Sequence, residues 1–174
     1  MRVWNVAVLA GLLATMPAAP PLETVRHVDL NRYTGRWFEI ARYPNRFERK
    51  CARDVTAEYS TKADGTIRVV NACITSASKI DRSEGTAKVV DPSTNAKLKV
   101  TFFWPFYGKY WIIGLGDQYE YAIVGEPSRE YLWILSRTPI LQDALYQKIL
   151  LQAAASGYDP QKLVRTTQTA AAKP

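Results

Sequence analysis

Few residues of this chain combine the types and the spacing that catalysis or metal binding needs. His27 is the only histidine, and the two cysteines, Cys51 and Cys73, belong to no CxxC or HxxxH pattern. A zinc site needs several such ligands, and an enzyme nucleophile needs a neighbouring base. The sequence therefore predicts a protein that is not an enzyme and that holds no metal and no cofactor.

Cys51 and Cys73 are instead candidates for a disulfide bond, because the chain begins like an exported protein. Arg2 supplies a positive charge, and a run of apolar residues and two alanines follow it. This run is shorter than the roughly 20 apolar residues that span a bilayer. We therefore expect residues 1–19 to form a secretory signal peptide with an approximate cleavage site, followed by one domain over residues 20–174.

The export prediction sets the state of the cysteines. In an oxidising compartment they are expected to form one disulfide, with two buried free thiols as the alternative. Neither cysteine follows the apolar run closely, so we find no acceptor for a lipid anchor there. The expected location is the periplasm or the cell envelope, with the mature protein soluble.

The formal net charge of +7 does not by itself identify a partner. Basic residues are scattered, and the densest group comprises Arg46, Arg49, Lys50 and Arg53. We interpret this group as a solvated loop, since no nucleic-acid motif accompanies it. No nucleic acid is expected as a partner, while weak contact with a membrane surface stays open.

Eight short segments of alternating apolar and polar residues provide the framework for any site. Turn signals such as Asp64-Gly65 and Pro127-Ser128 separate them. The expected strands cover residues 35–44, 55–60, 67–71, 85–90, 97–104, 109–115, 119–124 and 130–137. Such a meander leaves two exposed edges unless it closes, so the sequence predicts an all-β, eight-stranded antiparallel up-and-down barrel.

A helix is expected after the last strand. Thr138 is a plausible N-cap, Pro139 suits the first helical position, and Gly157 would end the helix. Leu141, Leu145 and Ile149 fall on one stripe, so this C-terminal α-helix should pack outside the barrel. The basic, alanine-rich tail, residues 165–174, is expected to be disordered at its end.

Two short motifs resemble those of a known family. Gly35-Arg36-Trp37 resembles the G-x-W motif that opens the lipocalin barrel, and Leu135-Ser136-Arg137 resembles the motif whose arginine covers that tryptophan. Residues 102–110 and 131–139 are similar to bacterial lipocalins of the Blc type, relatives of apolipoprotein D. The resemblance extends from about residue 28 to 163.

The resemblance implies reversible binding of a fatty acid, lysophospholipid or similar amphiphile, for storage, transport or envelope maintenance. Two departures accompany it. The family's middle T-D-Y motif is reduced to Gly116-Asp117-Gln118, and the cysteine that anchors many bacterial relatives to the outer membrane is missing. The composition itself indicates only a barrel with room inside, since the small residues Ala57, Ala87 and Asn71 are expected to face inward.

If Arg137 reaches inward to Trp37, alternation places every second residue of each strand in the interior. Adjacent aromatics at Tyr110 and Trp111 leave either one inward. Some inward residues could equally be ordinary core. The expected ligand-binding set is Ala57, Tyr59, Val69, Asn71, Ala87, Val100, Phe102, Trp111, Tyr131, Trp133 and Leu135.

Alternation from Trp37 also turns Glu39 inward, where a carboxylate is costly without a partner. It could act as a general acid or contact a headgroup. We favour a structural ion pair or hydrogen bond to an arginine or tyrosine near the barrel floor, since no second carboxylate or histidine is placed to share a proton.

Two further functions compete with that of a lipid carrier. A lipocalin-fold enzyme acting on an apolar substrate would need a nucleophile and a base, and His27 lies before the barrel. An interaction module would bind a partner or membrane through the open-end loops at residues 46–53 and 106–109, and it could coexist with the carrier. Ligand identity and oligomeric state are not predicted.

Overall fold

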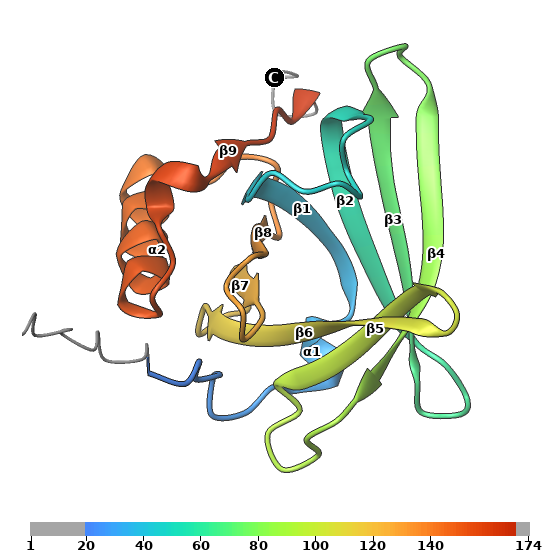
Figure 1. The fold of residues 1–174 in the computed structure, drawn as a ribbon, viewed down its shortest axis with the longest axis vertical. Helices are drawn as coiled ribbons and strands as arrows, with labels where there is room; N and C mark the ends of the chain where they lie inside the picture. Colours follow the sequence, from blue (N-terminus) through green and yellow to red (C-terminus); the bar gives the residue numbers. More distant parts are fainter. Residues whose placement is uncertain (1–19, 170–174) are drawn as a thin grey trace, which may run out of the picture.

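The computed structural model describes residues 20–169. The predicted signal peptide and the last five residues of the tail lie outside this range. Eight antiparallel strands curve into one barrel, with a helix along its outer side (Figure 1). The strands are β1 (Gly35–Arg42), β2 (Cys51–Thr61), β3 (Ile67–Thr75), β4 (Ile80–Val89), β5 (Lys97–Phe103), β6 (Phe106–Leu115), β7 (Tyr121–Gly125) and β8 (Leu132–Ser136).

Closure depends on β1, which pairs with β8 on one side and with β2 on the other. This confirms the predicted barrel, since no edge remains between the first and last strands of the meander. The pairing of β1 with β2 is short and covers only Gly35 to Phe38, opposite Tyr59 to Thr56. Beyond Phe38 the two strands diverge.

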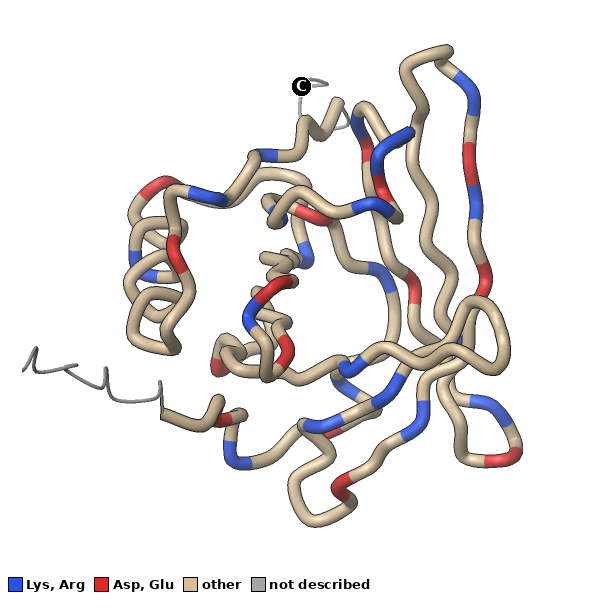
Figure 2. The backbone as a smooth tube through the Cα atoms, viewed as in Figure 1, with Lys and Arg blue, Asp and Glu red and all other residues tan. Residues whose placement is uncertain are grey.

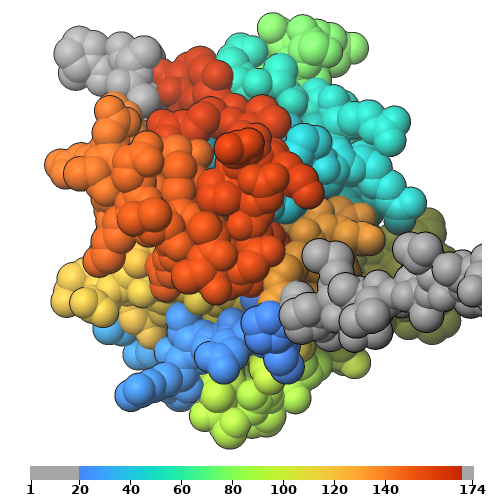
Figure 3. Space-filling model, turned by 60° about the vertical axis from the view of Figure 1, so that its left-hand side comes forward, coloured from blue at the N-terminus to red at the C-terminus, as the bar shows by residue number. Residues whose placement is uncertain are grey.

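Alternation divides the apolar residues between two cores. The inner core fills the barrel around Trp37, and the outer core lies between the barrel wall and α2 (Asp143–Ala155). Tyr146, Ile149 and Ala153 form the buried stripe of α2. In the space-filling view α2 and the chain after it cover one side of the barrel (Figure 3).

The predicted helix start is wrong by four residues. Thr138 does not cap a helix, because its hydroxyl donates to the carbonyl of Ile140 at 2.6 Å. The chain continues without helix to Gln142, which precedes α2, and Leu141 is buried before the helix begins. Gly157 ends the helix as predicted, with a φ of +84° that favours glycine.

Three short elements escape the alternation pattern. The helix α1 (Leu30–Tyr33) precedes β1, and η1 (Pro160–Lys162) follows α2. The third is β9 (Val164–Arg165), which pairs with the end of β1 at Arg42 and Ala41. The tail therefore adds a ninth strand where β1 has left β2.

Lysine and arginine positions are distributed along strands and loops around the barrel, as the sequence suggests (Figure 2). No helix within residues 20–169 has the length and apolar character needed to cross a membrane.

Candidate functional site

One end of the barrel is closed by the pair Trp37 and Arg137. The Arg137 guanidinium lies 3.8 Å from the centre of the Trp37 ring, and the indole Nε1 donates to the Tyr33 carbonyl at 2.9 Å. Arg137 also donates to the carbonyls of Arg36 and Arg32. Gly35 lies under this guanidinium with a φ of +92°, which explains the glycine of the G-x-W motif.

Glu120 holds the turn at Gly116-Asp117-Gln118, which departs from the family motif. The backbone N–H of Gln118 donates to the Glu120 carboxylate at 3.0 Å, and the N–H of Arg137 donates to the Glu120 carbonyl at 3.0 Å. The ring of Tyr119 lies under the guanidinium of Arg32. This end of the barrel is therefore a structural plug.

Above the plug, three tyrosine hydroxyls form a chain across the interior. The hydroxyl of Tyr110 lies 2.7 Å from that of Tyr33 and 2.9 Å from that of Tyr59. Burial raises the pKa of Tyr59 to about 12 and raises the pKa values of Tyr33 and Tyr110 as well. All three phenols are neutral at physiological pH and can both donate and accept hydrogen bonds.

Tyr110, and not Trp111, is thus the inward member of the adjacent aromatic pair. Trp111 packs with the outer core, and the Lys97 ammonium lies 4.7 Å from its ring centre. This corrects the expected ligand set, which includes Trp111 and omits Tyr110. Adjacent residues of a strand face opposite sides, so one of the two had to be outside.

The remaining expected residues line the interior in two layers. Ala57, Tyr59, Val69, Ala87 and Leu135 are buried within the inner core. Asn71, Val100 and Trp133 also face inward but are partly exposed, and Phe102 is 41% exposed. We call this half of the barrel, where inward side chains remain accessible, the open half.

The open half carries an unused hydrogen-bond acceptor. Asn71 lies opposite Ala57, which in turn lies opposite Trp37, and this register places all three on the inner face. Its Oδ1 atom is buried without a hydrogen-bond partner in the described part of the chain. Buried polar atoms are normally satisfied, so Asn71 is suited to a donor on a ligand.

Three aromatic rings lie together at and just before the start of β8. Tyr131 stacks on Trp133 with centroids 5.9 Å apart and planes 8° apart, and Phe47 lies 5.8 Å from Tyr131. Tyr131 itself precedes β8 and does not belong to the strand. The expected contact residues Tyr131 and Trp133 therefore form one stacked pair at the mouth.

A charged cluster lies beside this pair. Arg42 donates to Glu39 at 2.8 Å and lies 3.2 Å from Glu48. The indole N–H of Trp133 donates to Glu48 at 2.8 Å. Because one arginine faces two carboxylates, burial and the Glu48 charge together raise the pKa of Glu39 to about 8.

The expected arginine partner of Glu39 is present, but the premise that no second carboxylate lies nearby is wrong. The second carboxylate is Glu48. Glu48 lies within the basic segment interpreted as a solvated loop, and its isolated negative charge among arginines was the available signal.

The C-terminal tail closes the gap between β1 and β2 at the level of this cluster. The Gln168 side-chain amide donates to the carbonyls of Glu39 and Val55, at 2.8 and 2.9 Å. The Thr166 hydroxyl bonds to the Glu39 carboxylate. The tail thus supplies hydrogen bonds that the diverging strands cannot give each other.

The predicted disulfide is confirmed. Cys51 and Cys73 are bonded, with their Cα atoms 5.6 Å apart, and they join β2 to β3 near the open end. Their strands shift register between Cys51 and Thr56, so the bond lies where the ladder is irregular. It ties the mouth of the barrel together.

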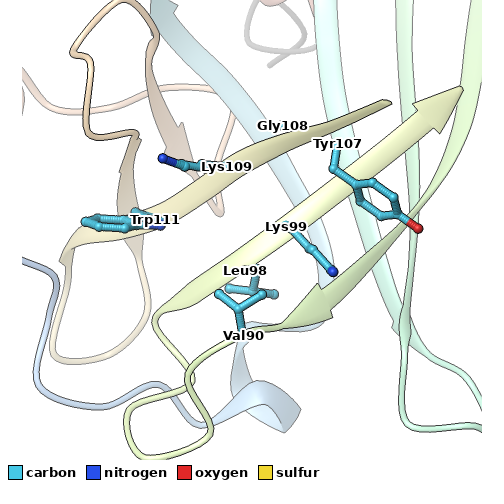
Figure 4. Close-up of a pocket in the computed structure, with 7 residues that line it drawn as sticks. All are labelled: Val90, Leu98, Lys99, Tyr107, Gly108, Lys109 and Trp111. Carbon is cyan, nitrogen blue, oxygen red and sulfur yellow. The ribbon is translucent and has the colours of Figure 1, made fainter. Parts of the chain in front are cut away.

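Two surface hollows lie outside the barrel. One, of about 340 Å³, follows β5 and β6 and includes Lys99, Lys109 and Trp111 (Figure 4). The other, of about 630 Å³, lies between Tyr43 and Arg129. Among the described residues there is no group of three or more histidine, cysteine or acidic side chains arranged to hold a metal.

Comparison with known proteins places these features in context. Residues 28–168 match the model of the lipocalin-like domain. The chain is 42% identical to the outer membrane lipoprotein Blc of Citrobacter freundii, over 98% of this chain and all of the relative. It is 41% identical to temperature-induced lipocalin-1 of Arabidopsis thaliana, over 85% and 83% of the two chains.

More distant relatives share the fold. Apolipoprotein D of Macaca fascicularis is 31% identical, over 86% of this chain and 81% of the relative. Insecticyanin from the tobacco hornworm Manduca sexta superimposes with a TM-score of 0.67 at 22% identity, covering 84% of each chain. Lobster apocrustacyanin A1 has a TM-score of 0.64 at 21% identity, covering 79% of this chain and 78% of its own.

Proposed function

Because the chain belongs to the lipocalin-like family, we propose that it carries a fatty acid, lysophospholipid or similar amphiphile in the open half of its barrel. The observation that carries the proposal is the row of inward yet accessible side chains at Asn71, Val100, Phe102 and Trp133. They combine apolar surface with a few polar groups, as small-molecule sites do. The acyl chain would lie between them.

The polar groups of the interior suit an amphiphile whose head remains near the mouth. Asn71 offers a free acceptor, and Trp133 is held in place by its hydrogen bond to Glu48. The tyrosine chain below is neutral, so the deeper interior suits an uncharged tail.

We propose binding without catalysis, in the cell envelope. The interior acids contact Arg42, whereas His27 is exposed and precedes the barrel. The export signal predicted for residues 1–19 and a bacterial relative named as an outer membrane lipoprotein support the location. N-terminal sequencing of the mature protein, purified from a periplasmic fraction, tests both the signal and the compartment.

Native mass spectrometry with lipid extraction, followed by displacement of a fluorescent fatty acid, tests the carrier function. Trp133→Ala should weaken binding about ten-fold, the equivalent of about 1.4 kcal/mol, because it removes one wall of the mouth. Trp111→Ala is the matched control, since it removes the same side chain from the outside and should leave affinity unchanged. Absence of any bound or titratable amphiphile, or equal losses in both variants, would rule out this site.

A further inference from the structure

The hairpin between β5 and β6 exposes a cluster of large aromatic side chains. Phe103, Trp104 and Phe106 are 78%, 77% and 73% exposed, within four consecutive positions. We call these three residues the aromatic tip. Single exposed apolar residues are ordinary, but a contiguous group of this kind marks a binding surface.

The two strands of this hairpin and their neighbour β4 bring three lysines into line. Lys88 of β4 lies directly opposite Lys99 of β5, which lies directly opposite Lys109 of β6. We call these residues the lysine row. Neighbouring strands are about 4.8 Å apart, and like charges directly opposite each other destabilise a sheet.

No acidic side chain in the described part of the chain forms an ion pair with these lysines, although the charge of the exposed Asp64 acts on Lys88. The six ion pairs formed within residues 20–169 include none of the three lysines. The side chains of Lys99 and Lys109 point away from each other along the hollow on β5 and β6 (Figure 4). The Lys99 ammonium lies 5.0 Å from the ring centre of Tyr107. The row is thus a positive surface whose lysines form no ion pair among the described residues.

We propose that the β5–β6 hairpin docks on an anionic lipid bilayer, with the aromatic tip in the interface and the lysine row against lipid phosphates. Lys99 lies four residues from Phe103, about 13 Å along the strand, and a lysine side chain shortens this by roughly 6 Å. The polar layer of a leaflet is about 5–8 Å thick. The spacing of Lys99 from Phe103 therefore matches the distance from phosphates to the acyl boundary.

Charge selects a bilayer over a second copy of the chain. A symmetric dimer through this surface would bring two lysine rows together without an acid between them. An anionic bilayer instead supplies phosphates to every lysine, and aromatic rings favour its interface.

The position of the hairpin also relates docking to ligand transfer. Phe102 immediately precedes the tip and contacts the inner wall at Gly85, so the hairpin forms part of the barrel's rim. Docking would bring the open end of the barrel close to the bilayer, which shortens the path of an amphiphile through water. This use rests on the proposed carrier function, whereas docking itself does not.

Vesicle cosedimentation tests the proposal with the whole mature protein. Binding to vesicles of phosphatidylcholine and phosphatidylglycerol should exceed binding to phosphatidylcholine alone and should weaken with salt. Replacing the lysine row by glutamine should reduce affinity on the order of 100-fold at low salt, since each lysine contributes roughly five-fold. The charge-matched control with Arg26, Lys148 and Lys162 replaced by glutamine should lose far less.

The tip has a matched control on α2. Leu151 is 73% exposed, the same fraction as Phe106, so Leu151→Ser and Phe106→Ser remove comparable apolar surface from different faces. Only Phe106→Ser should weaken vesicle binding. Brominated lipids should quench the wild-type emission, and Trp104→Phe should abolish that part of the quenching while retaining most binding.

Three results would overturn docking. The first is equal binding to neutral and anionic vesicles. The second is an equal loss of vesicle affinity in the target and control variants. The third is a sedimentation-velocity experiment in which Phe106→Ser abolishes self-association of the protein. Because vesicle binding is measured on protein freed of lipid, docking can fail while the carrier function holds, and the reverse.

Discussion

The cluster of Glu39, Arg42 and Glu48 makes folding stability depend on pH in a definite direction. The ordinary pKa of Glu39 is 4.5, and in the folded protein burial and Glu48 raise it to about 8. Between these values the folded state holds a proton that the unfolded state releases. Stability should therefore be greatest at low pH within this window and fall as the pH rises towards 8.

The limiting slope follows from linkage. One extra proton in the folded state changes the free energy of unfolding by about 1.4 kcal/mol per pH unit. Glu48→Gln keeps an acceptor for the Trp133 indole and removes the charge, so the pKa of Glu39 should fall towards its ordinary value. For each unit by which the pKa of Glu39 falls, the loss in free energy of unfolding between pH 5 and pH 8 should shrink by about 1.4 kcal/mol.

Urea denaturation at half-unit intervals from pH 5 to pH 8.5 measures this slope. Glu84→Gln is the control, because Glu84 is exposed and its hydrogen bond with Arg68 holds its pKa below the usual value, outside the window. Wild type and Glu84→Gln should share the steep decline, and Glu48→Gln should flatten it. A wild-type stability that rises with pH, or an unchanged slope in Glu48→Gln, would refute the coupling.

Three other perturbations test the frame around the site. Arg137→Ala should lower the melting temperature and leave ligand affinity unchanged. The variant loses a cation–π contact worth about 0.5–2 kcal/mol and the hydrogen bonds from Arg137 to backbone carbonyls. Lost affinity at an unchanged melting temperature would contradict the structural role of Arg137. Reducing the Cys51–Cys73 bond, whose cysteines are 22 residues apart, should lower the free energy of unfolding by about 3 kcal/mol. Thermal unfolding curves recorded with and without reductant measure this difference. Gln168→Ala should speed hydrogen exchange in β1 and leave β4 unchanged, since it frees the carbonyls of Glu39 and Val55.

The barrel could be predicted because its strands are long enough for period-two alternation to show. Trp37 and Arg137 could be paired from their motifs, although about a hundred residues separate them. Strand alternation then predicts that residues near the middle of strands, such as Ala57 and Val69, face the interior. Each of these inferences needs only a regular ladder.

The errors fall where the ladder or the local signal is ambiguous. Adjacent aromatics at Tyr110 and Trp111 satisfy either face, and the outer core under α2 decides between them. Thr138 and Pro139 are good helix starters, yet the Thr138 hydroxyl binds a carbonyl further along the chain. The two-residue β9 is too short to show periodicity, and backbone hydrogen bonds of Thr166 and Thr167 hold it in place together with side-chain hydrogen bonds of Thr166 and Gln168.

The bulge in β1 shows how one irregularity decides the chemistry of the site. Strict alternation from Trp37 would turn Ala41 inward and Arg42 outward. The register between β1 and β8 shifts between Glu39 and Ala41, so Arg42 comes to lie opposite the inward Trp133. A regular strand would turn Arg42 away from Glu39 and Glu48, so the two acids would lose the one cation that contacts both. The bulge therefore decides which charge stands beside the buried acid, and the residue pattern does not show a bulge.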